Sequence, residues 1–377
     1  MAVLQWNRLA GQERVKGVIG NAFQNGTLGH AYLFCGERGT GKFAAAVDLA
    51  MAVLCCHNGT RPCGECPSCK KVNTYSHPDF HIIMPVILEA EHRKNNDISE
   101  KGWQFMAASA KSRIDDPYKL PQYDKKPDIP VDWIREANQA ILRGATEGAY
   151  NAVIIDGVDS MKKESANAML KTLEEPPPGT VMILLTDKAH SVLPTILSRC
   201  QMIRFAPLPH DVIAAELVRR FGVGTDDSRV AIAAASGSLG VAIDEFENPR
   251  EEYFTAAADL WNDCLRGNWE AAAQSAEYLS GGKDAFSECQ KVLSCLIDLL
   301  RFAVLSKTGA PINYFYSGQS NKIELPEAIT PTDVENFVKL CQEALFALNA
   351  RGNAMLVMVN FVCTLMEMLN VEEQQAC

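Results

Sequence analysis

A short glycine-rich stretch constrains the fold of this 377-residue chain more than any other feature of its sequence. The stretch reads GERGTGKF at residues 36–43. It lies between an apolar run, AYLFC at 31–35, and a helical pattern, AAAVDLAMAVLC at 44–55. A strand, a glycine-rich turn and a helix in this order place backbone amides and a helix N-terminus around an anion. The sequence therefore predicts a phosphate-binding loop within an α/β fold.

The residue types in this loop indicate how it would hold phosphate. Three glycines allow the backbone conformations that aim amides at an anion: Gly36, Gly39 and Gly41. Lys42 adds a positive charge that can reach the outer phosphates. The next position is normally Ser or Thr, whose hydroxyl binds the Mg²⁺ of the nucleotide, but here it is Phe43. We expect a degenerate nucleotide site in which ATP or ADP binds weakly or not at all; a structural turn is the alternative.

A second motif strand carries the acid that a nucleotide site needs. The stretch NAVIIDGVD at 151–159 supplies Asp156, which would help to hold Mg²⁺. In active ATPases of this design the next residue is usually Glu, which polarises the attacking water, but here it is Gly157. Both the metal-binding hydroxyl and the water-orienting acid are missing, so the sequence predicts a chain that does not hydrolyse ATP alone.

Short apolar runs alternate with helix-length segments over the first half of the chain. Four of these runs are rich in Val and Ile or aromatic residues: 31–35, 80–86, 151–156 and 181–186. This pattern predicts a parallel sheet covered by helices on both faces. Residues 87–129 interrupt the pattern with charged and Pro-containing sequence, and we expect a surface insertion with one or two short helices. The chain beyond Pro207 is helical in pattern, with breaks at 280–284 and 309–326.

Composition and charge exclude several classes of protein. The start of the chain is polar and has no secretory signal, and the longest apolar run, 354–369, contains Asn360 and Glu367. We therefore expect a cytoplasmic protein without a membrane partner. The net charge of −10 argues against a chain whose whole surface binds nucleic acid, although it allows DNA contact shared with partners.

A cluster of cysteines predicts a metal site. Three thiols are spaced evenly within LCCHNGTRPCGECPSCKK at 54–71: Cys63, Cys66 and Cys69. With a fourth ligand nearby, such a run suits tetrahedral Zn²⁺. Cys55, Cys56 and His57 are the candidates for that ligand. A redox pair would need only two of these thiols, and an iron–sulfur cluster remains open on ligand type.

Three stretches together resemble a known family. NRLAGQERVKGVIGNAFQNGTLGHAYLFCG at 7–36, HPDF at 77–80 and the run from IIDGVD to SRC at 154–200 are similar to subunits of the bacterial DNA polymerase III clamp loader. These subunits are AAA+ proteins, among which gamma/tau hydrolyse ATP and delta prime generally does not. The resemblance is specific over residues 1–207 apart from the insertion, and weaker beyond.

The resemblance implies a three-part architecture. An AAA+ α/β domain is expected at 1–207, with the zinc loop at 55–69 and the insertion at 87–129. A small helical lid is expected at 208–247. An all-α collar that packs against other subunits is expected at 248–377, with a self-contained helical bundle as the alternative.

Departures from the active pattern favour the delta prime class. Phe43 and Gly157 lack the metal hydroxyl and the catalytic acid, and Gly240 stands where active subunits carry a sensor Arg. A gamma/tau-like ATPase is the alternative, and an unrelated phosphate-loop enzyme such as a nucleotide kinase comes third. The expected partners are the gamma/tau and delta subunits, the sliding clamp, and primer–template DNA within the complex.

The resemblance also bears on the cysteines and on one arginine. Clamp-loader subunits carry structural zinc at the place of the cysteine cluster, and the register of their helix favours Cys55 as the fourth ligand. Arg199 belongs to the SRC stretch at 198–200, whose arginine reaches into the ATP site of an adjacent subunit in this family. We expect Arg199 to act as such an arginine finger; a local salt bridge or a helix cap is the alternative.

Overall fold

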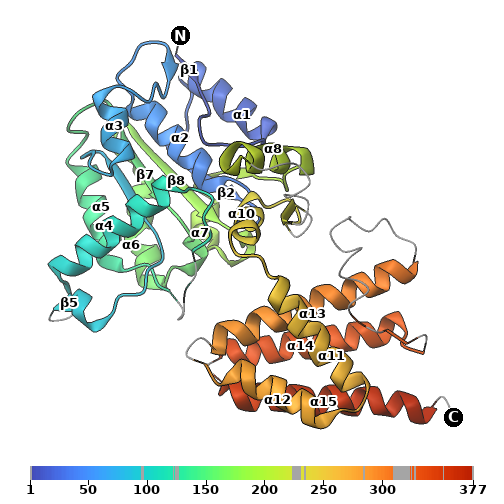
Figure 1. Ribbon diagram of the computed structural model, residues 1–377. Coiled ribbons are helices and arrows are strands. Elements are labelled where there is room, and N and C mark those ends of the chain that lie inside the picture. Colours follow the sequence, from blue (N-terminus) through green and yellow to red (C-terminus); the bar gives the residue numbers. More distant parts are fainter. Residues whose placement is uncertain are drawn as a thin grey trace. The chain divides into compact units, whose positions relative to one another are not determined.

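Contacts divide the chain into two units. The computed structural model describes residues 2–94, 97–121, 123, 127–222, 231–232, 235–282, 285–308, 323, 325–326, 328–350 and 352–375. Unit 1 comprises Met1–Thr225 and Ala235–Asp244, and unit 2 comprises Asp226–Ala234 and Glu245–Cys377 (Figure 1). The phosphate-type loop, the cysteines of residues 55–69 and Arg199 all belong to unit 1.

Unit 1 contains a five-stranded sheet with the order β4-β7-β8-β2-β9, in which every neighbouring pair is parallel. The strands of this sheet are β2 (Ala31–Cys35), β4 (Phe80–Ile83), β7 (Asn151–Ile155), β8 (Thr180–Thr186) and β9 (Gln201–Arg204). The first four confirm the strands predicted from the sequence. The fifth was missed because it is a short edge strand in which only Ile203 is buried.

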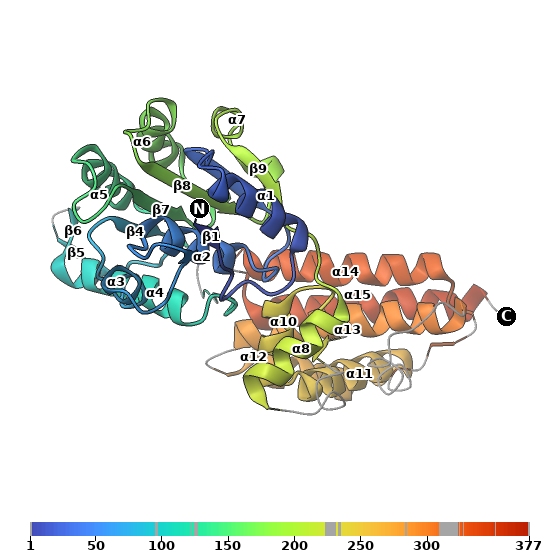
Figure 2. The same ribbon diagram turned by 90° about the horizontal axis from the view of Figure 1, so that it is seen from above.

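Helices cover both faces of the sheet, as predicted. The α-helices around it are α1 (Glu13–Gln24), α2 (Lys42–Leu54), α3 (Pro67–Asn73), α4 (Glu100–Asp115), α5 (Val131–Leu142), α6 (Lys163–Glu174) and the four-residue α7 (Pro194–Leu197). Figure 2 shows α5 and α6 on one side of the sheet and α2 and α3 on the other. The strand side chains alternate between these layers: Tyr32 and Phe34 pack into the core that contains α2, and Leu33 packs into the core that contains α5 and α6.

The helix behind the phosphate-type loop is apolar all round because it is buried all round. Each of the thirteen residues of α2 is buried, including Lys42 and Asp48. A helix that is apolar on every face belongs in a protein interior. Its N-terminus is therefore fixed rigidly against the carboxyl ends of the strands.

The remaining short elements of unit 1 connect this frame. They are the strands β1 (Val3–Leu4), β3 (Thr60–Arg61), β5 (Arg93–Lys94) and β6 (Asp97–Ile98), and the 3-10 helices η1 (Ala90–His92), η2 (Val158–Ser160) and η3 (Ala189–Ser191). β1 pairs with β3 in parallel, and β5 pairs with β6 antiparallel. Two further helices follow the sheet, α8 (His210–Phe221) and α10 (Leu239–Glu247). α8, and α10 as far as Asp244, belong to unit 1 by their contacts, while the predicted lid at 208–247 stays a prediction.

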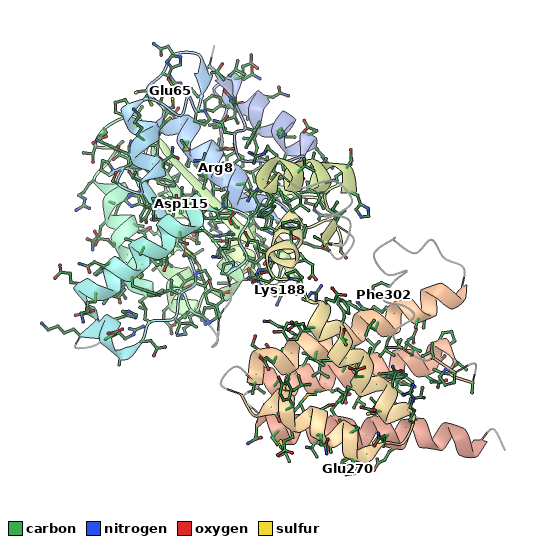
Figure 3. The ribbon with its side chains drawn as sticks, viewed as in Figure 1. Arg8, Glu65, Asp115, Lys188, Glu270 and Phe302 are labelled. Carbon is green, nitrogen blue, oxygen red and sulfur yellow. The ribbon has the colours of Figure 1, made fainter. Side chains whose placement is uncertain are left out.

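The segment expected as a surface insertion is more deeply integrated than predicted. Its helix α4 has 16 residues and is capped by Ser99, whose Oγ accepts a hydrogen bond from the Gly102 amide at 3.2 Å. Met106, Ala110 and Ile114 follow a spacing of four and are buried in the cores of unit 1. Asp115 marks the end of this helix in Figure 3.

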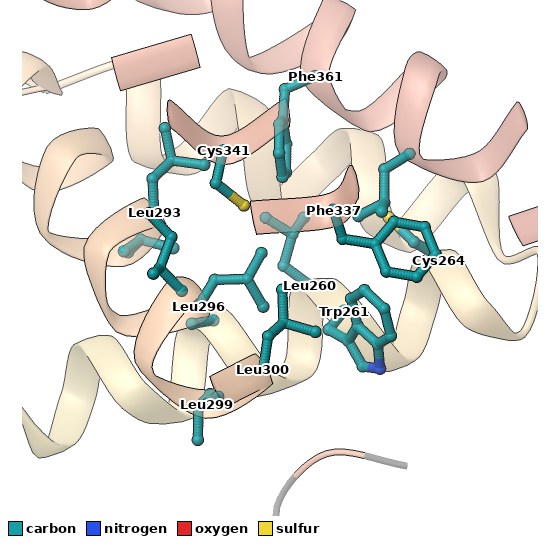
Figure 4. Packing of buried hydrophobic residues seen from close by; sticks show 14 of the residues in the cluster. Leu260, Trp261, Cys264, Leu293, Leu296, Leu299, Leu300, Phe337, Cys341 and Phe361 are labelled. Carbon is teal, nitrogen blue, oxygen red and sulfur yellow. The ribbon is translucent and has the colours of Figure 1, made fainter. Parts of the chain in front are cut away.

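Every described element wholly within unit 2 is a helix. The bounds are α11 (Glu251–Leu265), α12 (Trp269–Ser280), α13 (Ala285–Thr308), α14 (Pro331–Asn349) and α15 (Ala354–Gln375). Their apolar stripes meet in one core, where the rings of Trp261 and Phe337 pack edge to face at 5.2 Å (Figure 4). Most of the predicted break at 309–326 lies outside the described residues. None of the described helices is long and apolar enough to cross a membrane.

Candidate functional site

The phosphate-type loop has the backbone that the sequence predicted. It leaves β2 after Cys35 and enters α2 at Lys42, with Gly39 at φ +76° and Gly41 at φ +101°. Both values lie in the left-handed region that favours glycine. A Cβ atom at Gly41 would lie 2.9 Å from Tyr118 Oη, so that position also requires the absence of a side chain. The loop thus has the left-handed glycines expected of a phosphate-binding loop, and protein atoms lie close against it.

Lys42 is fully engaged by the protein itself. Its side chain is 7% exposed, and its Nζ donates to the carbonyl oxygens of Gly36 and Glu37, both at 2.7 Å. The third partner is the carboxylate of Asp187, whose Oδ1 lies 2.7 Å from Nζ. An ammonium group has three N–H donors. All three therefore have acceptors without any ligand.

Asp156 faces an arginine from the inserted segment. The Nε atom of Arg113, near the end of α4, lies 3.3 Å from Asp156 Oδ2. The guanidinium of Arg113 also lies over the ring of Phe43, 4.5 Å from its centroid. The Nη1 atom of Arg113 donates to the carbonyls of Pro117 and Lys119, at 2.9 and 2.7 Å. Arg113 thus contacts both Asp156, the acid predicted from the sequence, and Phe43, which replaces the metal-binding hydroxyl.

The positions where an ATPase would carry its catalytic acid and sensor arginine are sterically closed. Gly157 has φ +70°, and a Cβ there would lie 2.9 Å from Pro85 Cγ. A Cβ at Gly240 would lie 2.6 Å from the carbonyl oxygen of Tyr118 and 2.9 Å from Gly39 Cα. Both of these neighbours are backbone atoms, which cannot move aside cheaply. Neither position accepts a side chain without rearrangement of its surroundings.

A small hollow remains beside the loop. Its volume is about 250 Å³, and its lining includes Arg38, Lys42, Arg113, Tyr123, Asp156 and Asp187. At the end of β8, Thr186 Oγ1 donates to Asp159 Oδ1 at 2.7 Å instead of facing this hollow as a free hydroxyl. The predicted nucleotide residues are therefore together in space, but their polar groups are bound to one another and to the inserted segment.

Sequence reasoning missed three residues of this site: Arg113, Tyr118 and Asp187. Arg113 and Tyr118 lie in the segment that was expected to be a surface insertion, and no motif marks them. Asp187 follows Thr186 directly, at the end of a predicted strand. The ends of parallel strands meet at one edge of a sheet, so the position of Asp187 was the one signal that could have drawn attention to it.

The cysteine cluster forms as predicted. Four thiols lie within 4.8 Å of one another: Cys55, Cys63, Cys66 and Cys69. Cys55 lies at the end of α2, and Cys66 caps the start of α3. Cys56 and His57 are exposed and are not part of this group. Of the three candidates for the fourth ligand, the geometry favours Cys55.

The distances between the thiols fit a tetrahedral metal ion. Cys55 Sγ lies 3.6 Å from Cys63 Sγ and 3.8 Å from Cys66 Sγ, and Cys63 Sγ lies 4.0 Å from Cys69 Sγ. Four sulfurs at about 2.3 Å from one Zn²⁺ are about 3.8 Å apart, whereas a disulfide needs about 2.05 Å. The amides of Cys66 and Cys69 point at Cys63 Sγ and Cys66 Sγ, both at 3.4 Å. The cluster could therefore hold one metal ion.

The surroundings shift the pKa of three of these thiols in different directions. Burial pushes the pKa of Cys66 upward, but hydrogen bonds from the backbone at Cys69 and Cys56 and from their thiols outweigh it, and the pKa falls to about 6. Burial raises the pKa of the Cys55 and Cys69 thiols above the ordinary value. A bound divalent cation stabilises thiolates and so would reverse those two shifts.

Arg199 lies on the surface between α7 and β9. Its Nη2 atom pairs with Glu174 Oε1 at 2.8 Å, and its Nη1 atom donates to the Thr195 carbonyl at 2.9 Å. The side chain is 34% exposed. Such exposed pairs are worth at most about 1 kcal/mol. The local ion pair that was the alternative role of Arg199 is present, and it is weak enough to be exchanged for another anion.

The comparisons with known proteins identify the family. Residues 11–209 match the family described as DNA polymerase III, delta subunit. The chain belongs to this family. The match confirms the resemblance to clamp-loader subunits of the delta prime class. It covers the loop, the cysteines and Arg199, and it ends before unit 2 helices begin.

Several curated proteins are similar to this chain in sequence. The chain is 30% identical to DNA polymerase III subunit delta' of Bacillus subtilis over 209 residues, 55% of this chain and 52% of that protein. It is 28% identical to subunit delta' of Haemophilus influenzae over 230 residues, 61% of this chain and 58% of that protein. Subunit tau of Bacillus subtilis is 30% identical over 241 residues, 62% of this chain and 36% of that protein. The chain thus spans about a third to somewhat over half of the length of these relatives.

Proposed function

We propose that this chain is a delta prime-like subunit of the DNA polymerase III clamp loader, which helps to place the sliding clamp on primed DNA. Its partners would be the gamma/tau and delta subunits, the clamp, and primer–template DNA within the assembly. The family match and the two delta' relatives support this role. In this proposal the chain contributes to ATP hydrolysis by its neighbour and performs none itself.

One observation carries the non-hydrolysing part of the proposal. Backbone atoms of Tyr118 and Gly39 lie where any side chain at Gly240 would begin, so a sensor arginine there would require the surrounding backbone to shift. Phosphoryl transfer requires a metal, an oriented water and stabilisation of the developing charge. At this site the metal-binding hydroxyl is replaced by Phe43, and the water-orienting acid by Gly157.

The architecture proposed for this role has three parts. The sheet and its helices at 1–207 would form the AAA+ module, α8 and α10 would form a lid, and unit 2 would form the collar that binds other subunits. The cysteine cluster would hold one structural Zn²⁺, since four thiolates leave no open coordination position for a substrate. Arg199 would complete the ATP site of the adjacent subunit.

A gamma/tau-like ATPase is the second candidate, because subunit tau of Bacillus subtilis matches the chain at the same identity as subunit delta' does. Steady-state ATP hydrolysis by the purified chain separates the two. We expect no turnover above background, with or without DNA and clamp. If the chain hydrolysed ATP at about 1 s⁻¹, an ordinary enzymatic rate, and Lys42→Ala abolished this activity, the chain would be an ATPase.

Reconstitution tests the proposed role directly. Clamp loading onto primed DNA would be measured with gamma/tau and delta subunits, with and without this chain. We expect loading to require the chain. A complex that assembles and loads clamps equally well in its absence would contradict the proposal.

A further inference from the structure

The end of α4 and the residues that follow it lie against the phosphate-type loop and occupy part of the space beside it. We define the closing segment as residues 113–121, from Arg113 to Pro121. Its Arg113 contacts Phe43 and Asp156, its Tyr118 contacts Gly41, and the carbonyl of Pro121 accepts a hydrogen bond from Arg38 of the loop. One inserted stretch therefore touches each part of the site.

We propose that the closing segment and Asp187 together form a built-in occupant of the nucleotide site: Arg113 of the segment stands in for the metal cation, and Asp187, which follows β8, stands in for a phosphate. The inference rests on the proposed function, because it explains why a subunit of this kind keeps the loop without using it. It assigns a role to the insertion and predicts that the wild-type chain takes up no nucleotide.

The cationic half of this replacement rests on Arg113. A nucleotide-bound Mg²⁺ would neutralise Asp156, and in this structure the guanidinium of Arg113 does so at 3.3 Å. A guanidinium keeps its charge and stacks well on aromatic rings, whereas a metal ion needs oxygen ligands. Phe43 offers a ring face to the guanidinium and no oxygen to a metal. The substitution that removed the metal-binding hydroxyl thus provides the surface that the arginine packs against.

The anionic half rests on Asp187. Lys42 would normally bind the outer phosphates, but its three donors already contact two carbonyls and the Asp187 carboxylate. A phosphate could reach Lys42 only by displacing that carboxylate. The charges of the site balance within the protein: Lys42 pairs with Asp187, and Arg113 pairs with Asp156.

The closing segment is anchored as firmly as a core element. Tyr118 is 1% exposed, and its Oη accepts a hydrogen bond from the Ala10 amide at 2.9 Å. Arg220 of α8 lies over the Tyr118 ring and pairs with Asp116 at 3.2 Å. These contacts hold the segment in place, and a nucleotide would have to displace the two ion pairs that line the hollow. The hollow that remains, about 250 Å³, is smaller than the roughly 300–1,000 Å³ of ordinary ligand pockets.

Equilibrium binding of a fluorescent ATP analogue to the full chain tests this inference, with and without Mg²⁺. We expect no saturable binding by the wild type up to about 1 mM. The double variant Arg113→Ala/Asp187→Asn removes both the guanidinium beside Asp156 and the carboxylate beside Lys42. We expect it to bind the analogue with a Kd of about 0.1 mM or lower. Adding Lys42→Ala to the double variant should abolish the gain, because the phosphates would then lose their cation.

Lys111→Ala is the matched control. Lys111 lies on the same helix, two residues before Arg113, and pairs with Asp115 away from the hollow. We expect this variant to bind no nucleotide, like the wild type. A folded double variant, judged by circular dichroism, that binds no better than Lys111→Ala would overturn the inference.

Nucleotide binding by the wild-type chain can also overturn the inference, and this result does not depend on how the double variant folds. Saturable binding of the analogue below about 100 µM that is lost in Lys42→Ala would show that the site is open. Such binding without turnover would sink the closed-site inference and leave the proposed clamp-loader role intact. Conversely, a closed site in a chain that reconstitution shows to be dispensable would leave the inference standing without that role.

Discussion

Purified without chelator, the chain should contain one zinc ion, and Cys69→Ser should lose it together with much of the stability of unit 1. Cys69 is fully buried, and its thiol lies in the same core as α2. A ligand that binds only the folded state stabilises it by about 4 kcal/mol when present at a thousand times its dissociation constant. We therefore expect Cys69→Ser to lower the free energy of unfolding by at least about 4 kcal/mol.

The loss of stability should extend beyond residues 55–69, because α3, which carries Cys69, contacts α2 and Arg8. Ser68 Oγ donates to the Leu54 carbonyl at 2.6 Å, which joins the start of α3 to the end of α2. Arg8, labelled in Figure 3, pairs with Asp48 of α2 at 3.1 Å and donates to Asn73 Oδ1 of α3 at 2.6 Å. Release of the metal would loosen α3 from both partners.

Cys56→Ser is the control for this prediction. Cys56 is exposed, lies next to Cys55 in the sequence, and is outside the group of four thiols. We expect it to keep the metal and the wild-type melting temperature. Elemental analysis and thermal unfolding would be measured on all three proteins. A wild type without zinc, or a Cys56→Ser protein that loses as much metal as Cys69→Ser, would refute the assignment, and visible absorption with bound iron would indicate an iron–sulfur cluster instead.

The parallel sheet of unit 1 could be predicted because each of its buried strands leaves a pattern in consecutive residues of the sequence. Buried parallel strands are short continuous apolar runs, and four of the five strands of the sheet, including the edge strand β4, were predicted from the sequence to within three residues of their observed bounds. The edge strand β9 was not, since three of its four residues are exposed and its pairing with β2 is set by contacts across the fold. The even spacing of Cys63, Cys66 and Cys69 likewise predicts the cluster of four thiols that the structure contains.

The closed state of the nucleotide site could not be read in the same way. The sequence showed that Phe43, Gly157 and Gly240 lack functional groups, but it gave no reason for them to lack those groups together. For Gly240 the structure supplies a reason: Gly240 and Gly39 pack against each other and against the Tyr118 backbone. That contact joins residues more than 100 positions apart, and no local pattern encodes it.

The second large effect is expected from Arg199→Ala in the assembled complex. Charge develops on the γ-phosphate oxygens during phosphoryl transfer, and an arginine supplied from outside the site is worth about 10³–10⁵ in rate in well-studied cases. We expect Arg199→Ala to reduce hydrolysis to that extent at the one ATP site that this chain completes. The DNA- and clamp-stimulated ATPase of the whole complex should fall only in part, because its other sites receive their arginines from other subunits.

The ion pair with Glu174 provides the decisive control. If the only role of Arg199 is this local pair, then Arg199→Ala and Glu174→Gln, which break the same contact, should have the same effect on the complex. If Arg199 serves a neighbouring site, Glu174→Gln should leave ATPase activity intact, since it frees the guanidinium, and only Arg199→Ala should lose it. Each single variant should remain folded and zinc-loaded, because an exposed pair contributes at most about 1 kcal/mol.

Arg199→Lys then tests the kind of contact that is made. A lysine keeps the positive charge but lacks the planar fork that binds two phosphate oxygens at once. We expect the Arg199→Lys complex to fall well below the wild type in stimulated ATPase rate while retaining more activity than the Arg199→Ala complex. Unimpaired ATPase and clamp-loading rates in the Arg199→Ala complex would remove the proposed role, and they would leave the Glu174 ion pair as the sole function of this arginine.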